Sequence, residues 1–559
     1  MNITRTKETL KDITNIQRDY LTKICKSIDG LKCMILDSHT SQLVSLNFLQ
    51  SEGFEMEVFL FEDIKNIKDE NLNYVSAIYI ITSLQENLNI LCDELKNPHF
   101  KDYHIYFLSD VSDDIIRKFA ECDDNDLIKN LQRLYCNYHA LNPELFHSNS
   151  GRIVNLINKS IDQWSTSDRY TMDLMEESIL SALCSIRKIP TIRYLKNSEL
   201  SVYLADRLSA KFKKLSMTFP SEFEKQRTKL LIIERKEDPF TPLMFHWNYQ
   251  SMLHEIIGID ANKIKLKGKE YNLNLQHDDF YVQNLFSNYG EVANNLKAKI
   301  EELSSKKKQH KEIKQFEDMQ KLLSEMHDFQ KDTSITEKHF AFTDEISQQV
   351  NRRDMLTISK LEQEIATKDA KKDHYREIID ILNNKNIDRY DKFRLVALYS
   401  LKHQNSELSK ELQQFLGQIN PNYISAITKL IEFCGKNKRV AQSLTQNIGE
   451  KAFKIYKDYF NNIPNVYEQH VPLVARLAED ALKNKLREDE FPYIDSAPIR
   501  DAPTNVVVFV IGGVSFAEAK IFADLNNKYE DNFFLLGGSC MINSKTFLNE
   551  YVDLKIDSL

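Results

Sequence analysis

Residues 506–517 read Val-Val-Val-Phe-Val-Ile-Gly-Gly-Val-Ser-Phe-Ala, the longest apolar run in the chain. Six branched or aromatic residues that end in two glycines predict a buried strand followed by a tight turn. Ala517, Ile521, Phe522 and Leu525 then share one face of a predicted helix. The run is well short of the roughly 20 residues that cross a bilayer. We therefore interpret it as a strand-turn-helix unit of an α/β domain.

The same kind of unit recurs near the N-terminus. Four short apolar runs alternate there with helical stretches, at Leu31–Leu36, Met56–Phe61, Ala77–Thr82 and Tyr103–Ser109. Apolar runs that alternate with helices are typical of a largely parallel sheet. Residues 1–138 are thus predicted to form a first α/β domain.

The remaining chain predicts a second α/β domain that is interrupted by a helical one. Residues 151–217 have a helical pattern, and Lys229–Glu234 is a buried strand. From about 240 to 460 nearly every window is helical, and strands return at Val506–Ile511 and Phe533–Leu536. A chain of 559 residues also exceeds what one core usually supports. The predicted domains are 1–138, 139–238 together with 465–559, and an inserted helical domain 239–464.

The inserted domain contains two long apolar stripes at helical spacing. One stripe lies within 291–329, and the second runs from Ile346 to Ile365. We predict two long helices joined by Asp328–Phe342, which form a hairpin over 291–370. Two interpretations remain open, an internal helical pair buried in its own domain and a protruding hairpin that receives a partner helix.

Composition excludes several classes of function. The 74 basic and 82 acidic residues give a net charge of -8 and are spread along the chain, so a nucleic-acid partner is not expected. The N-terminus has no apolar run that could serve as a signal peptide. The eight cysteines show no CxxC pair, which predicts reduced core residues and no bound metal. We expect no cofactor, and membrane association only through partners.

The run from Gly513 to Ala517 resembles the nucleophile elbow of serine hydrolases, with Ser515 at its centre. In that architecture the catalytic base is a histidine that follows the serine, and the chain has no histidine after His470. The glycine pair Gly512-Gly513 lacks the spacing of a nucleotide-binding loop. We therefore predict that the chain is not an enzyme, with a hydrolase using Ser515 or a structural helical tether as alternatives.

A second dense segment, Glu234–Glu255, concentrates acids, histidines and aromatic residues. It could be an active site. The structural interpretation is that Asp238 caps a turn, Arg235 pairs with a carboxylate, and Trp247 and Tyr249 pack the first helix of the inserted domain.

This segment resembles the signature of the SM (Sec/Munc) family of SNARE-binding proteins. Further blocks agree in order at Leu31–Asp37, Asp278–Tyr281, Gly290–Lys297, Val508–Glu518 and Leu535–Gly538. The signature residues, to which the resemblance assigns a structural role, are Arg235, Asp238, Pro242, Tyr249, Gln250, His254, Glu255, Gly512, Gly513 and Glu518.

The resemblance implies an arch of three domains that regulates vesicle fusion without making or breaking a bond. Its partners would be a syntaxin-like Qa-SNARE and the assembling SNARE complex, including a vesicle R-SNARE. The branch most resembled acts in Golgi, endosome and vacuole transport. A cytoplasmic protein, peripheral on those membranes through SNAREs, is therefore expected.

The resemblance also implies particular binding residues. A pocket for the syntaxin N-terminal peptide would include Ile116, Phe119, Leu131 and Leu134, on two helical surfaces with Asp123, Asp124 and Asp126 nearby. Glu62 would face the cavity, and Phe340 and His327 would contact a SNARE helix on the hairpin. His327 stands where many members have a proline that bends the hairpin.

Overall fold

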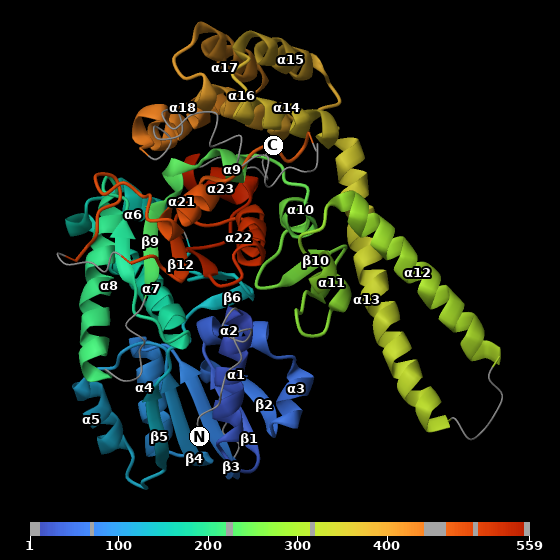
Figure 1. Ribbon diagram of the computed structural model, residues 1–559. Coiled ribbons are helices and arrows are strands. Elements are labelled where there is room, and N and C mark those ends of the chain that lie inside the picture. Colours follow the sequence, from blue (N-terminus) through green and yellow to red (C-terminus); the bar gives the residue numbers. More distant parts are fainter. Residues whose placement is uncertain are drawn as a thin grey trace. The chain divides into compact units, whose positions relative to one another are not determined.

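The computed structural model describes residues 12–67, 72–151, 153–219, 227–312, 319–440, 466–495 and 501–552, with side chains omitted over 307–328. The chain forms two compact units (Figure 1). Unit 1 contains Met1–Glu234, Ala478–Gly513 and Leu525–Cys540, and unit 2 contains Arg235–Leu477, Val514–Asp524 and Met541–Leu559. The division into three domains, 1–138, 139–238 with 465–559, and 239–464, remains a prediction.

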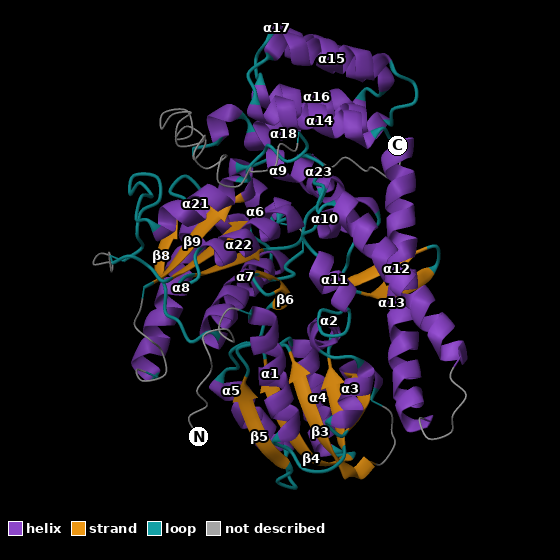
Figure 2. Cartoon of the chain, turned by 45° about the vertical axis from the view of Figure 1, so that its right-hand side comes forward, coloured by secondary structure: helices purple, strands orange, loops and turns teal. Residues whose placement is uncertain are grey.

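The first sheet of unit 1 is entirely parallel, with strand order β2-β1-β3-β4-β5. Its strands are β1 (Lys32–Leu36), β2 (Val58–Asp63), β3 (Leu72–Ile81), β4 (Phe100–Phe107) and β5 (Ile128–Arg133). Helices cover both faces (Figure 2). One core involves α1 (Ile13–Lys26) and α2 (Ser38–Asn47), and the other involves α4 (Gln85–Lys96) and α5 (Asp113–Cys122). A short helix, α3 (Gln50–Glu55), precedes β2.

Strand β5 corrects one expectation. The segment that contains Leu131 was predicted to be a helical surface, but it forms the edge strand beside β4. Its sequence, Ile-Lys-Asn-Leu-Gln-Arg, is only partly buried. An edge strand does not need the continuous apolar run of a central parallel strand, so the sequence signal is weak.

The second sheet of unit 1 has the order β6-β7-β13-β12-β9-β8, and only the β6–β7 pair is antiparallel. Val507 of β12 lies between Leu535 of β13 and Leu230 of β9. The strands are β6 (His139–Asn142), β7 (Leu145–His147), β8 (Thr191–Tyr194), β9 (Thr228–Glu234), β12 (Asn505–Ile511) and β13 (Phe533–Gly538). Its core includes residues of α6 (Val154–Asn158), α7 (Thr166–Ser185) and α8 (Glu199–Thr218). Strand β8 lies inside the region that was predicted to be helical throughout.

Unit 2 is largely helical. Its described residues include a small β-hairpin, β10 (Lys263–Leu266) and β11 (Lys269–Asn272). Its helices are α9 (Phe240–Leu243), α10 (Tyr249–Ile256), α11 (Asp279–Asn284), α12 (Tyr289–Glu312), α13 (Met319–Arg352), α14 (Met355–Thr367), α15 (Lys371–Asn383), α16 (Arg389–Lys402), α17 (Glu407–Ile419), α18 (Asn422–Cys434) and α23 (Ser544–Val552). Two further helices, α21 (Leu473–Leu482) and α22 (Phe516–Lys528), have residues in both units.

Helices α12 and α13 form a long antiparallel pair that extends from the rest of unit 2 (Figures 1 and 2). The predicted hairpin is therefore present, but its connection was placed wrongly. Residues 328–342 lie inside α13, and the two helices are separated by 313–318, outside the described residues. Within 328–342 the buried face of α13 is mixed, with Thr336 and His339 beside Phe342. Two polar residues thus interrupt the apolar stripe in a segment that is nevertheless helical and packed.

The predicted fold class, mixed α/β with mainly parallel sheets and a largely helical part that carries a long hairpin, is confirmed. All eight cysteines are free thiols. Among the described helices, none is both long and apolar enough to span a membrane.

Candidate partner-binding site

The signature residues at the start of unit 2 are held by buried polar contacts. Arg235 Nη1 lies 2.7 Å from Glu518 Oε1, and both side chains are buried. Glu518 Oε2 accepts hydrogen bonds from the backbone N–H of Ser515 at 2.8 Å and from its hydroxyl at 3.0 Å. The Ser515 hydroxyl is thus bonded to a carboxylate at the start of α22, where a helix cap is expected. Ser515 therefore has the contacts of a helix-capping residue.

Asp238 connects the starts of two helices. Its carboxylate accepts hydrogen bonds from the backbone N–H of Thr241 at 3.1 Å and of Leu473 at 3.0 Å. Burial acts to raise the pKa of Asp238, but the charge of Arg235 and these hydrogen bonds hold it below its usual value. The charged form of Asp238 therefore joins α9 to α21 within unit 2.

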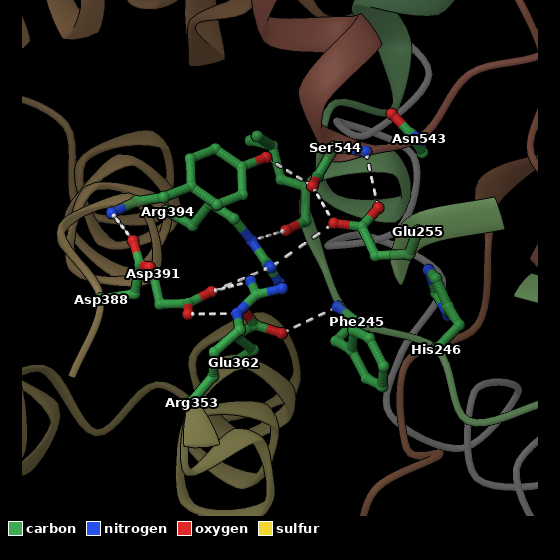
Figure 3. A network of polar contacts seen from close by, with 12 residues as sticks. Phe245, His246, Glu255, Arg353, Glu362, Asp388, Asp391, Arg394, Asn543 and Ser544 are labelled. Atoms are coloured by element: carbon green, nitrogen blue, oxygen red, sulfur yellow. Dashed lines mark hydrogen bonds and ion pairs between the residues drawn. The ribbon is translucent and has the colours of Figure 1, made fainter. Parts of the chain in front are cut away.

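A larger network surrounds Arg394 of α16 (Figure 3). Its guanidinium pairs with Glu362 of α14 and lies 3.3 Å from Asp391 Oδ1 and 3.7 Å from Glu255 Oε1. Arg353 binds Asp391 through two hydrogen bonds of 2.9 and 2.6 Å. Burial raises the pKa of Glu362 to about 7, against the opposing effect of Arg394.

Glu255 extends this network to the C-terminal helix. Its carboxylate accepts a 3.0 Å hydrogen bond from the backbone N–H of Ser544 and also pairs with the Ser544 hydroxyl. The signature residue Glu255 therefore joins α10 to α23, which lie far apart in the sequence (Figure 3).

The other signature residues are also buried. Gln250 donates a 3.0 Å hydrogen bond to the Tyr281 hydroxyl, and His254 Nδ1 accepts one of 3.1 Å from Ile259 N–H. Pro242 is buried within α9. Gly512 and Gly513 have φ values of 107° and 96°, which side-chain-bearing residues rarely adopt. The described signature thus consists of buried residues that organise the fold.

The residues predicted for the peptide pocket do not all lie together. Phe119 is buried and stacks on Phe107 at 5.9 Å, in the core that Leu131 also contacts. Leu134 is buried in the core on the opposite face of the sheet, with α1 and α2. Ile116 is 41% exposed on α5. The structure therefore corrects the four-residue grouping, and Ile116 is the most exposed of the four side chains.

The acids near α5 have different roles. Asp123 accepts hydrogen bonds from the backbone N–H groups of Leu127 and Ile128, at 2.8 and 2.9 Å. It therefore fixes the turn into β5. Asp124 and Asp126 are exposed and lie on the same surface segment.

The other predicted contact residues lie on an edge strand and on the hairpin. Glu62 is half-buried on β2, the edge strand opposite β5. Phe340 is 56% exposed on α13. His327 lies within α13, but its side chain falls outside the described residues. The described residues contain no cluster of His, Cys, Asp or Glu that could hold a metal.

One residue of this region was missed by the sequence analysis. His339 is fully buried on α13 beside the exposed Phe340. Histidine is intermediate in its preference for burial. The available signal was the stripe at helical spacing, because Phe342 and Ile346 follow His339 on the same face and are buried. The Asp278–Tyr281 block was singled out, and Asp278 is one of the residues that His339 contacts.

Comparisons with known proteins define the class. The Sec1 family model matches residues 32–550, and the chain therefore belongs to the Sec1 family. Among individual relatives, it is 31% identical to vacuolar protein sorting-associated protein 45 of Dictyostelium discoideum, over 98% of this chain and 97% of that protein. It is 29% identical to the protein of the same name from Homo sapiens, over 95% of each chain.

Solved structures agree with this assignment. The SM protein Vps45 in complex with the Qa SNARE Tlg2 matches with a TM-score of 0.85 and 28% identity, over 97% of this chain and 98% of that one. The Unc18–syntaxin 1 complex from Monosiga brevicollis shares the fold, with a TM-score of 0.78 at 17% identity.

Proposed function

We propose that this chain regulates SNARE-mediated vesicle fusion by binding a syntaxin-like Qa-SNARE and by promoting assembly of the SNARE complex. The observation that carries the proposal is the similarity to Vps45 solved with a Qa SNARE, which extends over 97% of the chain. The chain acts by offering formed surfaces to peptides and helices, with no covalent step. The molecules that it binds are proteins, and it requires no cofactor.

Two exposed apolar residues provide the contact points. Ile116 on α5 binds the N-terminal peptide of the Qa-SNARE, with Asp124 and Asp126 next to it for a basic residue of that peptide. Phe340 on α13 receives a SNARE helix, including that of a vesicle R-SNARE. Both side chains are large, apolar and partly exposed, so a partner that covers them gains free energy from the burial of apolar surface. Glu62 contributes a further polar contact to the SNARE.

The site of action follows from the partners. The chain works in the cytoplasm and reaches Golgi and endosomal membranes through membrane-anchored SNAREs. The similarity to vacuolar protein sorting-associated protein 45 of two organisms supports this location.

The experiment is calorimetric titration of the full chain with the N-terminal peptide of a syntaxin-like SNARE. Ile116→Arg places a charge at the contact point, and we expect the dissociation constant to rise at least about tenfold. Ile424→Arg is the matched control, because Ile424 is 40% exposed on α18 of unit 2. The control should bind as the unsubstituted chain does.

Equal affinity of the Ile116→Arg variant and the unsubstituted chain would place the peptide elsewhere. Absence of binding to every peptide in a panel of syntaxin-like SNAREs would contradict the proposed function itself.

A further inference from the structure

His339 occupies an unusual position on the long helix α13. Its side chain is fully buried, and its neighbour Phe340 is 56% exposed. Successive residues of a helix point about 100° apart, so this pair marks the boundary between a packed face and a free face. The inward residue is polar and must be satisfied by specific partners.

Both ring nitrogens of His339 have partners in unit 2. Nδ1 lies 2.7 Å from the Tyr249 hydroxyl, and Nε2 lies 2.9 Å from Asp278 Oδ2. The arrangement fits a neutral imidazole that accepts a hydrogen bond from the tyrosine and donates one to the carboxylate. Burial lowers the pKa of His339, which favours this neutral form. The ring also lies 4.9 Å from the ring of Phe280 and 5.6 Å from that of Phe342.

Asp278 joins the same point of α13 to the start of α11. Its Oδ1 accepts a 2.9 Å hydrogen bond from Tyr281 N–H, which caps α11. Its Oδ2 pairs with the ammonium of Lys338, the residue before His339. Two consecutive residues of α13 therefore bind one carboxylate, and a third hydrogen bond ties α13 to Tyr249 of α10.

Such contacts are specific to one register. A rotation of α13 by one residue, or a shift by one turn, would remove His339 from Tyr249 and Asp278 together. Both partners are buried, so the Tyr249 hydroxyl would lose its hydrogen bond to His339 and Asp278 would keep only the one from Tyr281 N–H. Apolar packing alone would tolerate such a slide more readily, because it is not directional.

We propose that Tyr249, Asp278, Lys338 and His339, the α13 anchor, are positioning residues that fix the register of the hairpin and so aim the Phe340 surface at a partner helix. The inference rests on the proposed function for the partner, whereas the anchor itself concerns the free chain. The signature residue Tyr249 and Asp278, from the Asp278–Tyr281 block, would therefore share one role, which is to hold α13 in its register.

The first test is hydrogen–deuterium exchange of the free, full-length chain carrying Tyr249→Phe. The substitution keeps the ring and removes the hydroxyl that donates to His339. We expect backbone amides of α12 and α13 to exchange about 5- to 30-fold faster, as the loss of one buried hydrogen bond allows. Tyr281→Phe is the matched control, because it removes a hydroxyl that accepts from Gln250 of α10 and keeps the ring that stacks on His339 at 6.2 Å.

The control should change hairpin exchange by less than about twofold. Unchanged exchange in Tyr249→Phe, or equal acceleration in both variants, would overturn the anchor.

The second test asks whether the anchor aims Phe340. A photo-crosslinking phenylalanine analogue replaces Phe340, and the probe is the SNARE-motif peptide of a vesicle R-SNARE. With Tyr249→Phe we expect crosslinking to fall several-fold, while the affinity for the syntaxin N-terminal peptide stays unchanged. A general loss of folding would reduce both.

Undiminished crosslinking in Tyr249→Phe would overturn the positioning role. No crosslinking in the unsubstituted chain would count against the proposed function, and the exchange measurement would still decide the anchor.

A milder pair of variants covers the case in which Tyr249→Phe does not fold. Lys338→Met removes the ion pair to Asp278, and Lys331→Met is the control, two turns away on the same helix and exposed. We expect about 2- to 5-fold faster hairpin exchange in Lys338→Met and no change in Lys331→Met. Equal exchange in the two variants would contradict the proposal.

Discussion

Arg394 is fully buried on α16 and lies among the carboxylates of Glu362, Asp391 and Glu255. These acids come from α14, α16 and α10, so one guanidinium neutralises charge from three helices (Figure 3). A buried ion pair adds little when it is complete, because desolvation offsets the attraction. Removing one partner is different, since the remaining charges stay buried without compensation.

We therefore expect Arg394→Leu to lower the unfolding free energy of unit 2 by about 3–5 kcal/mol. The chain has two tryptophans. A Trp164→Phe background leaves Trp247 of unit 2 as the reporter for urea unfolding. Arg376→Leu is the control, because Arg376 is exposed and only 3.8 Å from an exposed Asp373. It should change the free energy by less than about 0.5 kcal/mol.

An Arg394→Leu variant as stable as this control would show that the acids near Arg394 are protonated or solvated in the native chain.

At the scale of elements, strand β13 depends on a glycine where two aromatic rings meet. A Cβ on Gly537 would lie 2.5 Å from Phe146 Cζ and 2.8 Å from Phe509 Cδ2. Both rings are fully buried, on β7 and β12 at either side of β13. The close passage of the strand therefore requires a residue without a side chain.

Gly537→Ala should destabilise unit 1 by about 1–3 kcal/mol through overpacking, measured by urea unfolding in a Trp247→Phe background that leaves Trp164 as the reporter. Gly290→Ala is the same substitution near the start of α12, where the nearest atom is Asn288 Oδ1 at 3.5 Å. There we expect no loss, or a gain of up to about 1 kcal/mol from helix propensity. If both variants behaved alike, the steric explanation for Gly537 would be wrong.

At the scale of the whole molecule, buried histidines determine the response to acid. Burial lowers the pKa of His147 to about 3 and of His254 and His470 to about 4. In an unfolded chain these groups titrate near 6.5. As the pH falls from 6.5 toward 4, the unfolded state binds protons that the folded state excludes, so the unfolding free energy decreases.

Glu362 acts in the opposite direction. Its pKa is raised to about 7, so it becomes protonated in the folded chain first and favours folding as the pH falls from 7 toward 4.5. Each group contributes at most roughly 1.4 kcal/mol per pH unit, and several histidines oppose a single glutamate. We therefore expect the thermal midpoint to be highest above about pH 7 and to fall between pH 6.5 and 4.5.

Differential scanning fluorimetry over this range measures the effect, and His254→Gln should make the decline less steep. A midpoint that rises on acidification from pH 6.5 would show that the histidines are protonated in the folded chain.

The sequence by itself determined the central strands and the family. A parallel strand with helices on both faces must be apolar at nearly every position, so runs such as Val506–Ile511 are visible without any partner. The resemblance built on Glu234–Glu255 led to the family that the comparisons show. Edge strand β5 was not predicted, because its half-exposed residues form no continuous apolar run.

The tertiary structure decided the burial of polar residues and the faces that side chains share. The connection within the hairpin was misplaced because Thr336 and His339 interrupt the apolar face of α13 that Phe342 and Ile346 continue. His339 is buried there by partners 61 and 90 residues away in the sequence. Leu134 and Phe119 were predicted to line one peptide pocket, but they lie in the cores on opposite faces of the first sheet. Apolar burial can be read from neighbouring residues, whereas a polar side chain is buried only where distant segments supply its hydrogen bonds.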